Sequence, residues 1–591
     1  MEKTKEKVSG KIFDYQVFKK IMVYAKVYRL EFFISVVSVL LLAVLGAVNP
    51  LLIQKIIDVY LADKNWEMLL NFSLIMFAVL LGEVIFQFLF IFYANWLGQN
   101  VVNDIRIKLF DDLLKFKMSF FNRQPVGKLV TRVVSDIETI ESIFSQGLFT
   151  IISDLLKMVV IAGVMLYINW RLALIVFLLL PILIYATRLF QKAMKFAFQD
   201  VRAQVANLNT FVQERITGMA IIQLFTREKI EYDNFKEINN KHKKAWIKTV
   251  WYNSIFFPVA EVLPSIATGL VVWYGGFQAI TDSSIKPGAI ISFIMMITML
   301  FRPLRQIADK FTALQMGMVA ADRVFDVLEN NDEEGDEGKV VKENIEGKIT
   351  IKNLYFSYIK DEEVIKGIDL EVLPGETVAI VGATGAGKST IINLLNRFYP
   401  VNKGVIEIDD IPINDYKLHE LREHIAVVLQ TVFLFSDTIY NNITLKDPNI
   451  SREQVIAAAK DIGIHDFIMS LPNNYDYNVK ERGVMLSSGQ RQLIAFLRAS
   501  VSKPSILILD EATSSIDSHS EILIQEATEK ITKNRTSIVI AHRLATIKKA
   551  DKIVVMDKGL IVEQGTHAEL LEKGGYYSKL YNIQFLQKEA S

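Results

Sequence analysis

The first half of the chain contains six stretches that are long and apolar enough to cross a membrane as helices. A bilayer core about 30 Å thick takes about 20 apolar residues in a helix. Soluble helical domains rarely string together six runs of this length and apolarity. We therefore expect a membrane domain with six spans, at approximately residues 32–53, 69–97, 143–167, 171–192, 251–279 and 288–314.

The connections between these stretches predict how the chain is oriented. Lysine and arginine are frequent in the long segments that follow the second and fourth spans, and nearly absent from the three short connections. Basic loops stay on the cytoplasmic side. We therefore expect a multi-pass protein of the cytoplasmic (inner) membrane with both termini cytoplasmic. The long segments should be helices that extend the spans, and residues 14–28 should form an amphipathic helix on the inner membrane face.

The second, third and fifth predicted spans carry ionisable residues, and charge inside a membrane is costly and usually faces a cavity or a partner. Asp154 and Lys157 stand three residues apart, so we expect them to pair with each other. Glu83 and Glu261 have no evident local partner and stand near phenylalanines. They predict either a cavity for amphipathic, cationic compounds or a hydrogen bond between helices.

Composition excludes several other classes of function. The formal net charge of +1 argues against nucleic acid as a partner, because duplex binders carry a strong basic excess. The chain has no cysteine, which excludes disulfides, thiol catalysis and thiolate metal sites. Its seven histidines form no cluster with ligand spacing, so no transition-metal site is expected.

The second half of the chain has a different texture. Residues 329–344 are acidic, contain glycine and lack large apolar groups, which is typical of a linker or solvated loop. Short β-type runs then alternate with helical patterns, which indicates an α/β domain. We expect a transmembrane domain at 1–325, an acidic linker at 326–346 and a cassette domain at 347–591.

A phosphate-binding loop is the strongest motif in this second half. The sequence GATGAGKS follows the apolar run TVAIV and precedes a helical pattern. Glycines let backbone N–H groups turn toward phosphate oxygens, and the helix N-terminus favours their negative charge. The lysine is expected to bridge the β- and γ-phosphates of ATP and the serine to bind Mg²⁺. The predicted nucleotide-binding residues are Gly382, Ala383, Thr384, Gly385, Ala386, Gly387, Lys388, Ser389 and Thr390.

A second set of residues separates this chain from a kinase or a GTPase. The run SILILDE ends in Asp510, placed to bind Mg²⁺ at a strand end, and Glu511, placed to polarise the attacking water. Upstream lies the block Leu486, Ser487, Ser488, Gly489 and Gln490, followed by a helical pattern.

With these motifs the whole chain resembles the bacterial ABC exporters of the multidrug and lipid-A flippase type, in which one polypeptide fuses a transmembrane domain to an ATP-binding cassette. The likeness extends to the membrane half, where residues 120–136 and 214–228 resemble the two coupling-helix regions and residues 300–307 the exit from the sixth span. The resemblance implies a type IV exporter fold of six transmembrane helices plus an α/β P-loop NTPase cassette.

The resemblance also implies roles for single residues. Tyr358 matches the aromatic that stacks on adenine, and Gln430 matches the Q-loop glutamine that touches Mg²⁺. Asp517 matches the D-loop aspartate, and His542 the switch histidine at the γ-phosphate. The block at 486–490 matches the signature that caps the partner's γ-phosphate. Mg²⁺ would thus meet Ser389, Gln430 and Asp510.

The family's nucleotide lies between two chains, so a second half-transporter is an expected partner, with membrane lipid and a small amphipathic substrate. Ser488 stands where the family usually has glycine, which leaves both a homodimer, which we favour, and a heterodimer open. An ATP-gated channel or transport regulator on the same scaffold is the alternative to an exporter. A soluble P-loop kinase would not carry the six apolar stretches.

Overall fold

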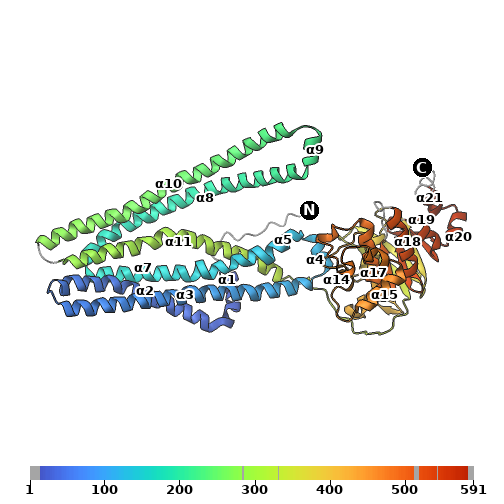
Figure 1. Cartoon of the computed structure of the whole chain (residues 1–591), viewed down its shortest axis with the longest axis horizontal. Helices are drawn as coiled ribbons and strands as arrows, with labels where there is room; N and C mark the ends of the chain where they lie inside the picture. Colours follow the sequence, from blue (N-terminus) through green and yellow to red (C-terminus); the bar gives the residue numbers. More distant parts are fainter. Residues whose placement is uncertain (1–13, 282–284, 331, 511–517, 542, 583–591) are drawn as a thin grey trace. The chain divides into compact units, whose positions relative to one another are not determined.

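The computed structural model describes residues 14–281, 285–330, 332–510, 518–541 and 543–582. The chain divides into two units (Figure 1). The helical unit comprises Met1–Lys115 and Gln124–Asn331, and the α/β unit comprises Phe116–Arg123 and Asp332–Ser591. A short segment from the first half of the chain, Phe116–Arg123, therefore belongs to the α/β unit.

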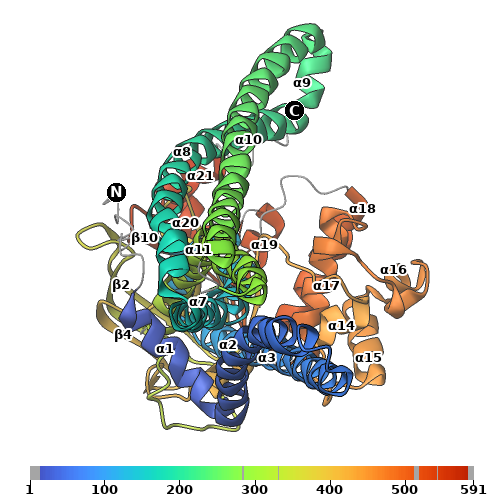
Figure 2. The same cartoon turned by 90° about the vertical axis from the view of Figure 1, so that its left-hand side faces the viewer.

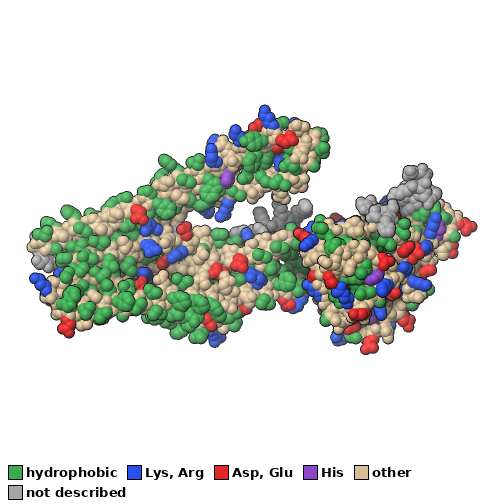
Figure 3. Space-filling model, viewed as in Figure 1, with side chains coloured by type: hydrophobic (Ala, Val, Ile, Leu, Met, Phe, Trp, Pro, Cys, Tyr) green, Lys and Arg blue, Asp and Glu red, His purple; other side chains and the backbone are tan. Residues whose placement is uncertain are grey.

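The prediction of six spans is confirmed. Within the described residues, six helical segments are long and apolar enough to cross a membrane, and hydrophobic side chains cover much of their visible surface (Figure 3). The segments are Tyr15–Leu61, Trp66–Leu114, Val126–Ile168, Trp170–Thr217, Glu228–Thr281 and Pro287–Leu328. Their helices are α1 (Tyr15–Ala25), α2 (Arg29–Lys55), α3 (Trp66–Leu114), α5 (Val126–Thr131), α6 (Ile137–Ser142), α7 (Phe149–Ile168), α8 (Trp170–Thr217), α9 (Met219–Leu224), α10 (Glu228–Thr281) and α11 (Pro287–Leu328).

Two of the short connections between spans carry residues that start the next helix. Asn65 accepts a hydrogen bond from the backbone N–H of Met68 and so caps α3. Asn169 caps α8 in the same way, accepting from the N–H groups of Arg171 and Leu172. An asparagine at this position satisfies donors that the first helical turn leaves without an intrahelical acceptor.

Helices α8 and α10 form a long antiparallel pair that ends at α9 (Figures 1 and 2). They contain 48 and 54 residues, far more than a bilayer core requires, and charged side chains gather toward the α9 end (Figure 3). For the segment after the fourth span, the expectation of helical extensions of the spans is thereby confirmed. Stacking between Phe190 and Phe256, with ring centroids 3.9 Å apart, fixes the pairing level of the two helices.

Both helices of this pair contain proline. Pro181 lies inside α8, and Pro258 and Pro264 lie inside α10. Pro181 lies 36 residues before the last residue of α8, and Pro264 lies 36 residues after the first residue of α10. In an antiparallel pair these two prolines stand at the same distance from α9.

The predicted amphipathic helix at the start of the chain is present as α1. Asp14 caps it by accepting from the N–H of Gln16 at 2.9 Å. Its apolar residues Val17, Ile21 and Ala25 are buried, and α1 packs against α3 and α11. Its place at the membrane surface stays a prediction.

The α/β unit contains two sheets. One has four antiparallel strands in the order β2-β1-β4-β5 and the other has six strands in the order β10-β9-β3-β8-β7-β6, in which β10 alone is antiparallel to its neighbour. The strands are β1 (Ile349–Ser357), β2 (Glu363–Val372), β3 (Thr377–Gly382), β4 (Lys403–Ile408), β5 (Ile411–Pro412), β6 (Ile425–Val428), β7 (Ile506–Asp510), β8 (Thr536–Ile540), β9 (Lys552–Asp557) and β10 (Leu560–Gly565).

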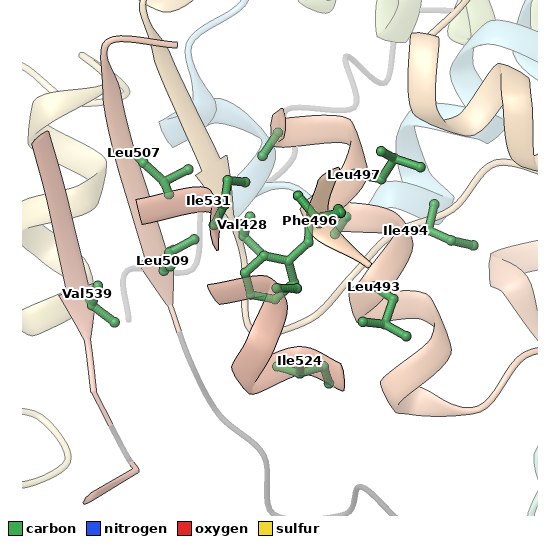
Figure 4. Packing of buried hydrophobic residues seen from close by; sticks show 14 of the residues in the cluster. Val428, Leu493, Ile494, Phe496, Leu497, Leu507, Leu509, Ile524, Ile531 and Val539 are labelled. Carbon is green, nitrogen blue, oxygen red and sulfur yellow. The ribbon is translucent and has the colours of Figure 1, made fainter. Parts of the chain in front are cut away.

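Helices complete the α/β unit and bury one face of the larger sheet. Phe496 on α17 lies among Val428 of β6, Leu509 of β7 and Ile524 of α18 (Figure 4). The helices are α4 (Met118–Arg123), α12 (Lys388–Leu395), α13 (Leu418–Glu423), α14 (Ile439–Thr444), α15 (Arg452–Ile462), α16 (His465–Met469), α17 (Ser488–Val501), α18 (Ser518–Thr532), α19 (Leu544–Lys549), α20 (His567–Glu572) and α21 (Tyr576–Tyr581).

The acidic segment that precedes β1 packs on this unit along much of its length. Glu334 forms a two-armed ion pair with Arg422 of α13, and Asp336 accepts from the N–H of Leu418 at 2.8 Å. We call residues 332–348 the strap. Its acidic residues Glu334 and Asp336 bind specific donors of the α/β unit, so these charges attach the strap to the unit as well as making it soluble.

The C-terminal end of the strap is held by one buried carboxylate. Asp409, on the turn between β4 and β5, accepts from the N–H groups of Glu346, Gly347 and Lys348 and from Lys342 Nζ, at 2.8 to 2.9 Å. Its side chain is only 6% exposed. The neighbouring Asp410 instead reaches Lys348 Nζ with 71% of its side chain exposed.

Candidate nucleotide-binding site

The predicted phosphate-binding loop lies at the carboxyl edge of the parallel strands. It connects β3 to α12, and β3 is flanked by β8 and β9. Ile540 of β8 pairs with Ile380 on one side and with Asp510 of β7 on the other. This register brings Asp510 level with the end of β3. In open α/β sheets ligands bind at this edge.

Glycine is required at Gly382 for steric reasons, at the point where the chain leaves β3. A Cβ atom on Gly382 would lie 2.2 Å from the carbonyl oxygen of Met556 on β9. Gly385 differs, because its backbone has φ +85° but an added Cβ would meet nothing within 4 Å. The first glycine keeps the loop close to the sheet and the second only allows its left-handed backbone.

The lysine of the loop turns back into the loop. Lys388 Nζ donates to the carbonyl oxygens of Gly382 and Ala383 at 2.8 and 3.0 Å. The residue is 7% exposed, and burial lowers the pKa of Lys388, an effect that the nearby carboxylate of Asp510 opposes. A buried cation inside a glycine loop at a helix N-terminus suits a phosphate group.

Ser389 and Asp510 supply oxygen atoms beside this lysine. Ser389 Oγ lies 3.5 Å from Asp510 Oδ2. A hydroxyl and a carboxylate are hard ligands of the kind that Mg²⁺ takes together with phosphate oxygens, so the donor set fits this ion. Gln430 is exposed just beyond the end of β6, two strands from β8 in the same sheet.

Tyr358 is held in a defined position beside the loop helix α12. The residue is 44% exposed, while its hydroxyl donates to Thr390 Oγ1 at 3.3 Å and accepts from Asn393 Nδ2 at 3.0 Å. Phe356 and Tyr399 contact the Tyr358 ring edge to face, with centroids 4.8 and 4.9 Å away. An exposed, fixed aromatic face next to a phosphate loop is suited to stacking on a base.

The signature block forms the beginning of α17. Ser487 caps the helix by accepting from the N–H of Gln490, whose side chain accepts in return from the N–H of Ser487. Leu486 is buried beneath this turn. Ser488 is the first residue of the helix, so its N–H and that of Gly489 have no intrahelical acceptor and can serve an anion. The hydroxymethyl group of Ser488 is exposed.

Three predicted site residues lie outside the described residues: Glu511, Asp517 and His542. Their neighbours are placed, because Asp510 ends β7 and the N–H of Ala541 donates to the carbonyl of Ile380 on β3. The roles of these three residues stay predictions.

The ionisable residues of the spans pair differently from the prediction. Asp154 and Lys157 were expected to bind each other, which is wrong. Asp154 forms an ion pair with Lys310 of α11, and Lys157 Nζ lies 4.0 Å from Glu83 Oε1 on α3. Helical spacing offered a local partner, but the two side chains reach partners on other helices instead.

Glu83 and Glu261, for which the sequence indicated no nearby partner, also bind polar side chains of other helices. Glu83 accepts from Asn49 Nδ2 of α2 at 3.2 Å, and Glu261 of α10 pairs with Arg305 of α11. These pairs join consecutive long helices, with partners 34 and 44 residues apart in the sequence. They were missed because a partner on another span leaves no spacing pattern.

Sequence reasoning also missed the residues that hold Tyr358. Asn393 lies on the helix that begins with Lys388, one turn beyond Ser389, and its spacing could have indicated a residue near the loop. Tyr399 follows that helix in the run NRFYP, and nothing in the sequence indicated its contact with Tyr358.

Comparison with known proteins agrees with this architecture. The family model described as the ABC transporter transmembrane region matches residues 32–304, and the ABC transporter model matches residues 365–514. The ABC transporter ATP-binding protein YknV of Bacillus subtilis, itself uncharacterized, is 34% identical over 98% of this chain and 96% of its own length.

Two further relatives cover the chain almost completely. The ATP-dependent lipid A-core flippase of Syntrophus aciditrophicus is 35% identical over 96% of this chain and 94% of its own length. YgaD of Bacillus subtilis, named as a candidate multidrug export ATP-binding/permease protein, is 35% identical over 96% of this chain and all of its own length. The chain therefore belongs to the ABC transporters, as an exporter-type half-transporter that joins a multi-pass membrane domain to a cassette that hydrolyses ATP for transport.

Proposed function

We propose that two copies of this chain form an exporter that moves amphipathic or hydrophobic compounds, such as drugs, lipids or peptides, across the cytoplasmic membrane. The carrying observation is that one chain supplies both halves of a nucleotide site: the loop with Lys388, Ser389 and Asp510, and the helix N-terminus at Ser487–Gly489. Relatives named lipid A-core flippase and candidate multidrug exporter support this cargo class.

In the proposed site the two chains contribute different groups. Lys388 and the loop N–H groups bind the phosphates of ATP, Tyr358 stacks on adenine, and Ser389, Asp510 and Gln430 hold Mg²⁺. Glu511 positions the water, His542 contacts the γ-phosphate, Asp517 forms the D-loop contact, and Ser487 to Gln490 of the second chain cap the nucleotide. Serine at 488 keeps its N–H, so the altered signature retains the donor that an anion needs.

Transport by the purified chain tests this proposal. The protein is reconstituted alone in lipid vesicles, and ATPase activity, trapped nucleotide and movement of lipids, dyes and peptides are measured. Robust turnover, two nucleotides trapped per dimer and ATP-dependent movement of a compound support the homodimeric exporter. Activity that needs a second, co-expressed half-transporter contradicts the homodimer, and ATP binding without uphill transport indicates a gated channel or regulator.

The control for turnover is Glu511→Gln. An amide cannot accept the proton of the attacking water, so this variant should bind ATP with unchanged affinity and lose hydrolysis by orders of magnitude. Near-normal ATPase activity in Glu511→Gln would remove Glu511 from the proposed mechanism.

We further propose that Glu83 and Glu261 take part in cargo recognition. Both carboxylates face cations of other spans, at Lys157 and Arg305, so a cationic cargo group has to compete with these partners. Glu83→Gln and Glu261→Gln should reduce export of cationic dyes at unchanged basal ATPase. Glu67→Gln, an exposed change at the start of α3, is the matched control, and normal dye export in both test variants contradicts this role.

The membrane orientation is part of the proposal. We infer that the cassette and both termini are cytoplasmic, because in a six-span topology they share a side with the segments after the second and fourth spans, and basic segments stay on the cytoplasmic side. Labels introduced at the two termini and in the short connection near residue 65 should be protected from an external reagent at the termini and accessible at the connection. The opposite pattern contradicts the orientation.

A further inference from the structure

The segment Phe116–Arg123 is anchored in the α/β unit although it lies in the sequence between two membrane spans. Its backbone joins the strap, because the N–H of Lys117 donates to the carbonyl of Asp332 at 2.9 Å. Phe116 and Phe120 are buried, with ring centroids 4.7 Å apart. The segment is therefore a packed part of the α/β unit, although the residues that precede Phe116 and those that follow Arg123 both belong to the helical unit.

One polar side chain of this segment reaches toward the nucleotide site. Asn122 Nδ2 donates to the hydroxyl of Tyr399 at 2.6 Å. The Tyr399 ring meets the Tyr358 ring edge to face, at 4.9 Å and with an angle of 88° between the planes. Two direct contacts thus connect Asn122 to the aromatic ring proposed to carry the base.

The Tyr358 ring is fixed from its other sides as well. Phe356 is buried and contacts the ring edge to face at 4.8 Å, and the Tyr358 hydroxyl is held by Thr390 and Asn393 of α12. Phe356 also contacts Tyr399, with centroids 5.8 Å apart. Because the Tyr399 and Phe356 rings contact each other and both contact Tyr358, a shift of Tyr399 changes the packing around the Tyr358 ring.

We propose that Asn122 and Tyr399 are positioning residues that set the Tyr358 ring for the nucleotide base and link this ring to the segment Phe116–Arg123. The inference rests on the proposed base-stacking role of Tyr358. Binding of the base and the conformation of the segment Phe116–Arg123 are then coupled. The coupling acts in both directions: a base that favours one conformation of the segment is itself bound more tightly in that conformation.

Two substitutions test the link by removing the hydrogen bond between Asn122 and Tyr399. Tyr399→Phe keeps the ring and its edge-to-face contact but removes the hydroxyl that Asn122 binds. Asn122→Ala removes the donor from an exposed side chain. Tyr440→Phe is the matched control, because it also removes a tyrosine hydroxyl, here one that donates to the carbonyl of Ile450 at 2.8 Å. Asn122→Asp should restore the link, since its carboxylate can accept from the Tyr399 hydroxyl.

The kinetic readout is the separation of KM from kcat in the full-length protein. Losing one hydrogen bond that positions the base contact should raise the KM for ATP about two- to tenfold and leave kcat within about twofold. Asn122→Ala and Tyr399→Phe should show this change together with no further increase in the double variant. Tyr440→Phe and Asn122→Asp should behave like wild type.

The structural readout is hydrogen exchange of the backbone amides at residues 116–123, with ADP as the probe. ADP carries the base but lacks the γ-phosphate that a second chain's signature would cap, so any response reports the base and its own chain. ADP should slow exchange of this segment in wild type and in Tyr440→Phe. At saturating ADP, Tyr399→Phe and Asn122→Ala should lose this response.

Tyr358→Ala separates the two proposals. If it leaves ADP affinity unchanged, the base-stacking role of Tyr358 is wrong and the inference falls with it. If it weakens ADP binding about tenfold, as loss of stacking predicts, the role stands. In that case, a wild-type ADP response at 116–123 in both Tyr399→Phe and Asn122→Ala would refute the link alone.

Discussion

Asp409→Asn should loosen the C-terminal end of the strap, because Asp409 accepts four hydrogen bonds there through two oxygen atoms. Oδ1 accepts from the N–H groups of Gly347 and Lys348, and Oδ2 accepts from the N–H of Glu346 and from Lys342 Nζ. An asparagine keeps one acceptor oxygen and turns the other into an NH₂ donor that faces two donors. Two charge-assisted bonds are lost, at about 1.5 kcal/mol each.

The expected cost is therefore about 3 kcal/mol of local stability. Hydrogen exchange at the Glu346, Gly347 and Lys348 amides measures this quantity in the full-length protein, where global unfolding is not two-state. At about 1.4 kcal/mol per tenfold change, exchange should become about 100-fold faster. Asp410→Asn is the control, because its pair with Lys348 is exposed and exposed ion pairs contribute little to stability.

The same contrast has a pH dependence. Burial raises the pKa of Asp409, but the Lys342 ammonium and the three backbone N–H groups outweigh burial and hold the pKa below its ordinary value. The stabilisation is then complete above the carboxyl pKa of the unfolded chain, about 3.9, and is lost as pH falls through the lower folded pKa. Wild type and Asp409→Asn should differ fully at pH 7, and the difference should begin to shrink below about pH 4 and vanish only below the folded pKa of Asp409. Equal exchange in the Asp409 and Asp410 variants at pH 7 would refute this account.

Three further outcomes are expected. Lys388→Ala should weaken ATP binding at least about tenfold, because a charged donor to the phosphates is lost; unchanged affinity in a nucleotide titration contradicts its role. Ser488→Gly should leave ATPase activity within about twofold, because the backbone N–H persists; a large gain or loss would show that the hydroxymethyl group matters. Lys310→Met should lower the thermal unfolding temperature in detergent by leaving Asp154 unpaired, and adding Asp154→Asn should recover most of the loss; additive losses would contradict the pair.

Patterns within one element predicted the architecture well. Six apolar runs became six span-length helices, and the loop around Lys388 lies between β3 and α12 as its sequence indicated. Apolarity and glycine spacing act locally, so they can be read without knowing what lies opposite. The reciprocal cap between Ser487 and Gln490 is local in the same sense, because its two residues stand three positions apart.

Contacts between distant segments could not be predicted in this way. Asp154 had a plausible partner three residues away, and only helix packing gives it Lys310 instead. The acidic strap looked like a solvated linker because composition does not reveal that Arg422 and a turn at Asp409 provide its partners. Asn122 and Tyr399 are 277 residues apart, and although Asn122 lies in the stretch that resembles a coupling-helix region, no pattern around either residue indicates the other.

Pro181 in α8 and Pro264 in α10 give the two long helices points, at the same level, where both can bend. Proline leaves the carbonyl four residues earlier without its usual N–H partner, so bending there breaks fewer hydrogen bonds than elsewhere. Pro181 and Pro264 stand at the same distance from α9, so both helices can bend at one level without sliding past each other. The 36 residues from each proline to the α9 end of its helix extend over about 54 Å. A rotation of about 10° at the prolines would therefore carry α9 through about 9 Å. A small angular change at the two prolines would thus become a displacement larger than a side chain at the α9 end of the pair.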